Sequence, residues 1–129
     1  MALRLALDAN RYVDFCKGQT AAVEPLRKAQ EIVLPFIVLA ELRAGFRLGN
    51  RRDKNEAILA RFLQSPRVAV LFADEGTTHF YAELFAELRQ AGTPIPTNDL
   101  WIAALVVQHD LTLLTRDKHF DRLPRIPRI

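Results

Sequence analysis

The chain has 129 residues, of which 50% are hydrophobic and 26% charged, with a formal net charge of +3. This length is typical of one domain, and the composition is that of a globular protein, which excludes a disordered chain. The longest apolar run, residues 34–40, is far shorter than the roughly 20 residues of a membrane helix, so we expect no membrane contact. A single cysteine, Cys16, excludes an internal disulfide and a cysteine-based zinc site. We predict one cytoplasmic domain over residues 1–129.

Short apolar segments alternate with amphipathic segments along the chain. In chain order, these patterns predict strand 3–7, helix 12–17, helix 20–29, strand 31–34, helix 35–48, helix 53–64, strand 68–72, helix 75–91, helix 97–109 and strand 111–114. Strands that alternate with helices indicate a mostly parallel sheet covered on both faces. We therefore predict the α/β class, with three α/β/α layers around a short, mostly parallel sheet.

Turn and cap residues set the limits of the predicted helices. Gly18 is a typical terminator, and Pro35 opens a helix at no cost because the N–H it lacks would have no partner there. Three further residues have side-chain oxygens that can accept a hydrogen bond at a helix N-terminus, and we predict them as N-caps: Thr20, Asp74 and Thr97. The apolar faces of the helices at 53–64 and 75–91 are expected to be Ile58, Leu59, Phe62 and Leu63, and Phe80, Leu84, Phe85 and Leu88.

Two acidic residues directly follow predicted strands. Asp8 follows the first strand, and Asp117 lies three residues beyond the last one. Ligands of such sheets gather at the carboxyl ends of the strands, so we expect both side chains at that edge. An acid after a strand is also a common turn or cap residue, so neither position indicates function by itself.

Two further acids lie on apolar faces of predicted helices. The residues three and four positions from Glu41 are all uncharged: Ile37, Val38, Ala44 and Gly45. Asp99 begins a similar apolar face, although the helix dipole also favours an acid in the first turn. Burial of an unpaired carboxylate costs several kcal/mol unless another group neutralises it. Both positions are therefore candidates for a functional site.

Four carboxylates at one sheet edge would repel one another, and their protonation would be coupled. A hard divalent cation relieves this repulsion, and carboxylate oxygens are ligands that Mg²⁺ and Mn²⁺ prefer. The sequence thus predicts a metal site formed by Asp8, Glu41, Asp99 and Asp117. Its chemistry would be attack of a metal-activated water on a phosphodiester.

Basic residues gather in two segments. The first contains Arg43, Arg47, Arg51, Arg52 and Lys54, and the second contains Arg116, Lys118, Arg122, Arg125 and Arg128. Of the 18 basic residues 14 are arginine, whose planar fork matches phosphate geometry better than lysine does. The clusters permit a polyanionic partner, but a solvated surface explains them equally well.

At these residues the chain resembles the PIN-domain ribonucleases, specifically the toxins of VapBC-type toxin–antitoxin pairs. Four blocks in the expected order carry the resemblance over nearly the whole chain, at 7–10, 39–45, 98–104 and 113–120. The four acids named above match the acids of these blocks. Thr115 matches the hydroxyl that orders the last acid, and Asn10 is expected to support the first. Ala9 replaces the usual hydroxyl residue, which we expect to tune the site without abolishing it.

The resemblance implies an Mg²⁺- or Mn²⁺-dependent endoribonuclease that cuts structured RNA, such as a tRNA or rRNA loop. All four acids would hold metal, directly or through water, and one of them would orient or deprotonate the nucleophile. The resemblance also implies a homodimer and a cognate antitoxin whose tail occupies the active-site groove. Candidate contacts to RNA phosphates are Arg43, Arg47, Arg116 and Lys118.

Other classes of protein stay open at this point. A catalytically silent domain could bind RNA or antitoxin without cutting. An aspartyl-phosphate phosphatase would use Asp8 as nucleophile, but Asn10 stands where such enzymes carry a second acid. A signalling receiver domain would need an acidic pair after the first strand. We expect His119 to be a surface-loop histidine and Asp14 to be a solvated acid.

Overall fold

The computed structural model describes residues 2–129 and contains a four-stranded parallel sheet. The strands are β1 (Arg4–Leu7), β2 (Glu31–Pro35), β3 (Val68–Leu71) and β4 (Thr112–Leu114). Their order in the sheet is β3-β2-β1-β4, and all three pairs are parallel. The two central strands, β2 and β1, are buried along nearly their whole length, as a sheet covered on both faces requires.

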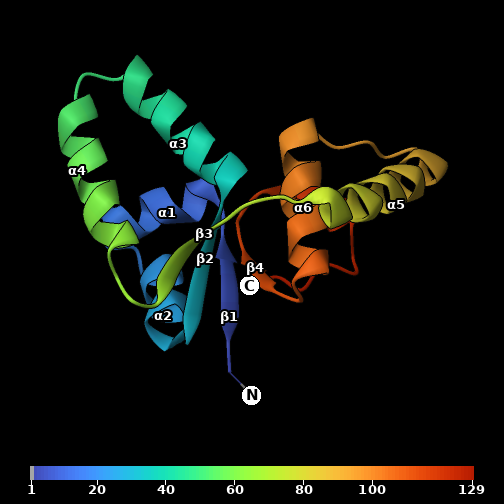
Figure 1. Cartoon of the computed structure of the whole chain (residues 1–129), viewed down its shortest axis with the longest axis horizontal. Coiled ribbons are helices and arrows are strands. Elements are labelled where there is room, and N and C mark those ends of the chain that lie inside the picture. Colours follow the sequence, from blue (N-terminus) through green and yellow to red (C-terminus); the bar gives the residue numbers. More distant parts are fainter. Residues whose placement is uncertain (1) are drawn as a thin grey trace.

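Six α-helices and a short 3₁₀-helix complete the fold of residues 2–129. The α-helices are α1 (Ala9–Cys16), α2 (Thr20–Lys28), α3 (Phe36–Leu48), α4 (Arg52–Leu63), α5 (Glu75–Ala91) and α6 (Thr97–Gln108). The 3₁₀-helix η1 covers Lys118–Arg122. In Figure 1 helices α1 to α4 lie on one side of the sheet and α5 and α6 on the other, which confirms the predicted three-layer α/β/α fold. Within residues 2–129, we find no helix that combines the length and apolar character needed to cross a bilayer.

The sheet register determines where the functional side chains lie. Leu7 of β1 pairs with Leu114 of β4, and the Asp8 N–H donates to the Leu114 carbonyl oxygen at 3.1 Å. The residues that follow these two strands, Asp8 and Thr115, therefore leave the sheet side by side. Strand β2 continues directly into α3 at Pro35. The C-terminal edge of the sheet thus brings the start of α1, the start of α3 and the loop after β4 together.

Helix starts differ from the prediction at α1 and at two predicted caps, and by one residue at α3 and α4, which begin at Phe36 and Arg52. Helix α1 begins at Ala9 rather than at residue 12, because Asp8 is its N-cap and accepts a hydrogen bond from the Ala9 N–H at 2.8 Å. The predicted caps Thr20 and Thr97 are wrong, since both lie inside their helices. Pro96, with φ near −56°, is already the N-cap of α6, so the helix begins one residue earlier than the threonine would place it.

The cap of α5 is as predicted, but two apolar faces are narrower than expected. Asp74 and Thr77 form a capping box, in which each side chain accepts a hydrogen bond from the backbone N–H of the other. Phe85 and Ile58 are exposed, so their predicted burial is wrong. Phe85 follows the fully buried Leu84, and Ile58 precedes the fully buried Leu59. Because each residue turns a helix by about 100°, the side chain next to a buried leucine points away from the packed face.

Candidate metal centre

Asp8 is held rigidly at the junction of β1 and α1. It is only 5% exposed, and its Oδ2 accepts a hydrogen bond from the Thr115 hydroxyl at 2.6 Å, while Oδ1 accepts the Ala9 N–H. Burial raises the pKa of the Asp8 carboxyl, the two hydrogen bonds oppose this rise, and the charge of Asp117 adds to it. The structure therefore places a buried carboxylate next to a second acid, with hydrogen bonds from neutral donors.

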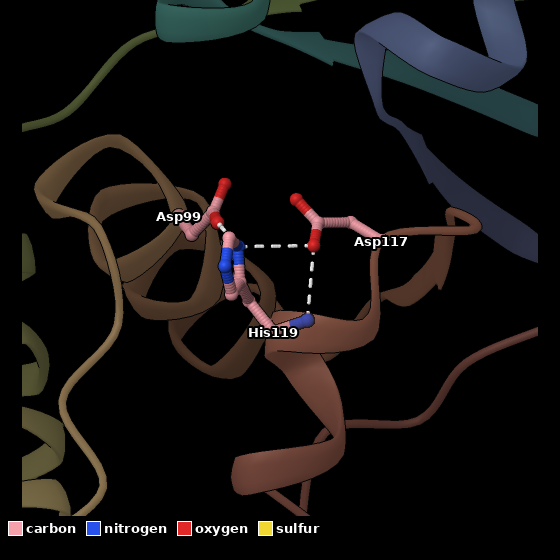
Figure 2. A group of neighbouring side chains, drawn as sticks. All are labelled: Asp99, Asp117 and His119. Atoms are coloured by element: carbon pink, nitrogen blue, oxygen red, sulfur yellow. Dashed lines mark hydrogen bonds and ion pairs between the residues drawn. The ribbon is translucent and has the colours of Figure 1, made fainter.

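Asp99, Asp117 and His119 form a compact group on the other side of this edge (Figure 2). The His119 Nδ1 lies 2.9 Å from Asp99 Oδ2 and 3.0 Å from Asp117 Oδ1. The ligand atoms of the three side chains all lie within 4.8 Å of one another, close enough to hold one metal ion. Asp99 is 7% exposed, and burial together with the charge of Asp117 raises its pKa to about 6, against the opposing hydrogen bond of His119.

Glu41 reaches the same cluster from α3. Its side chain is half-buried, and the Asn98 amide donates to its Oε2 at 3.5 Å. Burial raises the pKa of the Glu41 carboxyl, the Asn98 hydrogen bond lowers it, and the charges of Asp8, Asp99 and Asp117 raise it further. The structure thus brings the four sequence-predicted acids together. The apolar surroundings of Glu41 are less complete than predicted, because Ala44 and Gly45 are exposed.

Thr115 and Asn10 organise the loop that carries Asp117. The Thr115 hydroxyl oxygen accepts a hydrogen bond from the Asp117 N–H at 3.0 Å while the hydroxyl donates to Asp8, so one side chain links two acids. Asn10 Oδ1 accepts a long hydrogen bond, 3.4 Å, from the Arg116 N–H. Both residues therefore support the loop: Thr115 bonds directly to the Asp117 backbone, whereas Asn10, which was expected to support Asp8, bonds to the backbone next to Asp117.

The expected solvation of Asp14 is wrong. Asp14 is 3% exposed, and its Oδ2 accepts hydrogen bonds from Arg11 Nη1 and Arg116 Nε, each at 3.0 Å. The Arg116 hydrogen bond lowers the pKa of the Asp14 carboxyl, and the same contact raises the pKa of Arg116. Sequence spacing could have suggested Arg11, three residues before Asp14, but Arg116 is more than 100 positions away and is brought in only by the fold.

The other sequence-predicted cations and His119 differ in their surroundings. Arg43 forms an exposed ion pair with Glu56 at 3.3 Å, whereas Arg47 and Lys118 are exposed without an ion-pair partner among residues 2–129. His119 lies at the surface as expected, with its side chain 44% exposed, but its ring also contacts the two acids, which the prediction missed (Figure 2). Its position two residues after Asp117, at a strand end, is the one sequence signal that could have indicated this.

The residues of this cluster fit a divalent cation. Burial and mutual repulsion raise the pKa of Asp8, Glu41 and Asp99, so their shared ionised state is unfavourable without a positive charge between them. Oxygen donors suit Mg²⁺ and Mn²⁺, and the imidazole of His119 is a donor that Mn²⁺ accepts more readily than Mg²⁺. The cluster could therefore hold a divalent metal ion.

Known proteins share both the sequence pattern and the fold. The PIN domain family matches residues 5–126. The chain is 35% identical over 105 residues to ribonuclease VapC2 of Rickettsia felis, covering 81% of this chain and 77% of the relative. It is 33% identical over 122 residues to ribonuclease VapC1 of Haemophilus influenzae, covering 91% and 90%.

Structural comparison agrees with these sequence matches. The crystal structure of VapBC2 from Rickettsia felis bound to a promoter DNA fragment superposes with a TM-score of 0.86 at 30% identity, over 98% of both chains. The structure of VapBC-1 from nontypeable Haemophilus influenzae gives a TM-score of 0.85 at 25% identity, over 98% of this chain and 97% of that one. This chain therefore belongs to the PIN-domain family, in the VapC group of toxin–antitoxin ribonucleases.

Proposed function

We propose that the chain is a divalent-metal-dependent endoribonuclease that cuts structured RNA and is inhibited by a cognate antitoxin. The observation that carries the metal dependence is the cluster of acids at the C-terminal sheet edge, where three carboxyl groups have raised pKa values and His119 bridges Asp99 and Asp117. Such a cluster destabilises the metal-free protein, and a bound cation would offset this repulsion.

Each acid has a role that follows from its surroundings. Asp8, Asp99 and Asp117, with His119, would hold the metal, and Glu41 would face it from α3. Bound Mg²⁺ or Mn²⁺ would lower the pKa of a water molecule and offset the charge that develops on the scissile phosphate. Glu41 is the most exposed of the predicted acids whose pKa is raised, so it is the best placed to accept the proton of the attacking water.

Other polar residues orient the acids or are candidates to contact the RNA. Thr115 fixes the positions of Asp8 and Asp117 relative to each other, and Asn98 orients the Glu41 carboxylate. Lys118 and Arg47 are the exposed predicted cations left without an ion-pair partner among residues 2–129, so they are the better candidates for phosphate contacts. Arg43 and Arg116 would first have to leave Glu56 and Asp14.

A protein partner is part of this proposal. Solved relatives that superpose on nearly the whole chain are toxin–antitoxin complexes, one of them with promoter DNA. We infer that this chain also binds a cognate antitoxin, whose tail would occupy the groove over the acids, and that it acts as a homodimer. The aspartyl-phosphate alternative is weaker, because both carboxylate oxygens of Asp8 already accept hydrogen bonds and the side chain is buried.

The test is RNA cleavage by the purified chain, freed of antitoxin, with Mg²⁺, with Mn²⁺ or with excess EDTA. We expect discrete fragments that require the metal, and a loss of about 1,000-fold or more in rate for Asp99→Asn, as several kcal/mol of transition-state stabilisation would disappear. If the folded protein cleaves nothing with either metal, it is a silent RNA- or antitoxin-binding domain. Phosphate release from an aryl phosphate would instead support the phosphatase.

A further inference from the structure

The connection between α3 and α4 forms an open cavity of about 570 Å³. We call it the basic cavity, and its lining residues are Arg47, Gly49, Asn50, Arg51, Arg52, Asp53 and Lys54. The lining has four cations and one acid, an excess of three positive charges, which equals the formal net charge of the entire chain. The formal charges of all other residues therefore sum to zero, and the cavity is a local excess of positive charge.

The cations of the basic cavity are not used to stabilise the fold. Arg47, Arg51 and Lys54 form no ion pair among residues 2–129, and Arg52 has only a 3.8 Å contact with the fully exposed Asp53. Arg51, Arg52 and Lys54 also surround the first turn of α4, where the helix dipole makes cations unfavourable. A bound anion would supply the missing ion-pair partner and would also offset the repulsion between these cations and the helix dipole.

We propose that the basic cavity binds the phosphate backbone of the RNA substrate at a distance from the cut; this inference rests on the proposed function. Glu41 and the cavity lie on the same helix, since Arg47 is six residues beyond Glu41, about 9 Å along the axis of α3. Figure 1 shows the α3–α4 connection at the end of α3 that is remote from the sheet. An RNA strand that crosses the acids and follows α3 therefore reaches the cavity with a flanking segment.

The chemistry of the lining favours RNA over an acidic protein segment. None of the seven lining residues has an apolar side chain, and the apolar residues of the neighbouring pocket that shares Arg51 and Lys54 lie outside this lining. Three of the four cations are arginines, which form paired hydrogen bonds with phosphate oxygens. Recognition by charge alone is the mode that fits a nucleic-acid backbone.

The test compares two double variants that each remove one arginine and one lysine. Arg51→Gln/Lys54→Gln changes the basic cavity, and Lys28→Gln/Arg61→Gln removes two exposed cations on α2 and the far half of α4, which also have no ion-pair partner among the described residues. All proteins, including the reference, carry Asp99→Asn to prevent cleavage. The probe is a fluorescein-labelled single-stranded RNA of about 20 nucleotides, titrated by fluorescence anisotropy at several NaCl concentrations in EDTA.

We expect the cavity variant to bind this RNA roughly tenfold more weakly at physiological salt, with a salt-dependence slope smaller by about 1.4, since each lost contact to single-stranded RNA contributes about 0.7. The matched variant should keep the slope of the reference protein. Equal slopes for both variants would overturn the inference. Loss of binding to polyglutamate by the cavity variant, with RNA binding intact, would also overturn it and assign the cavity to an acidic protein.

Cleavage by the wild-type chain separates this inference from the proposed function. If wild type cuts RNA in the presence of metal but the cavity variant binds RNA like the matched variant, the inference alone fails. If wild type neither cuts nor binds RNA, both fail. Circular dichroism of each variant provides the check that these exposed substitutions leave the fold intact.

Discussion

Asp8 and Asp14 are buried carboxylates at the two ends of the same short helix, yet their surroundings are electrostatically opposite. Asp14 accepts hydrogen bonds from two guanidinium groups, and the one from Arg116 above all holds its pKa below the usual value. Asp8 accepts hydrogen bonds from a hydroxyl and an amide, and burial raises its pKa. Asp14 is therefore neutralised within the chain, whereas Asp8 lacks a cation.

This difference separates structural acids from functional ones. Burial alone does not identify a site, since Asp14 is at least as buried as Asp8. The informative feature is a buried carboxylate whose neighbours are other carboxylates. The two regions are also connected, because Arg116 lies between Thr115 and Asp117 and its ion pair with Asp14 fastens the loop that holds these residues.

The largest expected effects come from replacing each of these acids by its amide. Asp8→Asn should reduce RNA cleavage about 1,000-fold while Tm of the metal-free protein stays equal or rises, because one repelling charge is removed. Asp14→Asn should lower Tm by roughly 5–10 °C, because two arginines lose their anionic partner. The measurements are a cleavage assay and thermal melting in EDTA. A large fall of Tm for Asp8→Asn would mean that Asp8, too, is a structural acid.

Manganese should distinguish the two regions in a second way. At Mn²⁺ about tenfold above its Kd, linkage predicts a rise in Tm of about 5 °C for wild type and for Asp14→Asn, and much less for Asp8→Asn. Equal shifts in all three proteins would contradict the assignment of Asp8 to the metal site.

The same titration examines His119. If its Nδ1 is a ligand, His119→Asn should weaken Mn²⁺ binding about tenfold, whereas His79→Asn, at an exposed position, should not. Electron spin echo spectra of the Mn²⁺ protein should then contain nitrogen modulation that only His119→Asn removes. Absence of this modulation in wild type would limit the metal ligands to oxygen.

The fold and the four acids could be predicted from the sequence because their signals are local or periodic. Alternation of strands with helices determines the parallel sheet, and the positions of Asp8 and Asp117 after strands, with Glu41 and Asp99 on apolar helix faces, indicate one edge. The catalytic and metal-binding roles of these acids stay predictions, which the amide variants test.

Two features of the site could not be predicted because they depend on contacts across the chain. The Asp14–Arg116 pair joins residues that meet only when β4 is placed beside β1. The orientation of His119 depends on the turn of η1, for which spacing gives no angle. In both cases the sequence shows residues of the required type, but the partner is set by tertiary structure.

The smallest predicted effect is a pH dependence with opposite signs in the two regions. The pKa of Asp99 is about 6 in the folded protein and 3.8 ordinarily, so the folded state binds the extra proton. The contribution of Asp99 to stability is complete below pH 3.8 and is lost as the pH rises through 6. We therefore expect Tm in EDTA to increase by a few degrees when the pH is lowered from about 7 to 5. Asp8 and Glu41, whose pKa values are also raised, act in the same direction.

Asp14 gives the reverse dependence on the acid side of this range. Because its folded pKa is lowered, its contribution is present above its ordinary pKa of 3.8 and is lost as the pH falls through the folded value. Melting curves from about pH 8 to pH 3 should therefore pass through a maximum in Tm. As the pH is lowered, Asp99→Asn should reduce the rise in Tm before the maximum, and Asp14→Asn should reduce the fall in Tm after it. A rise of the same size in wild type and Asp99→Asn would show that Asp99 is already neutralised in the metal-free protein, as Asp14 is.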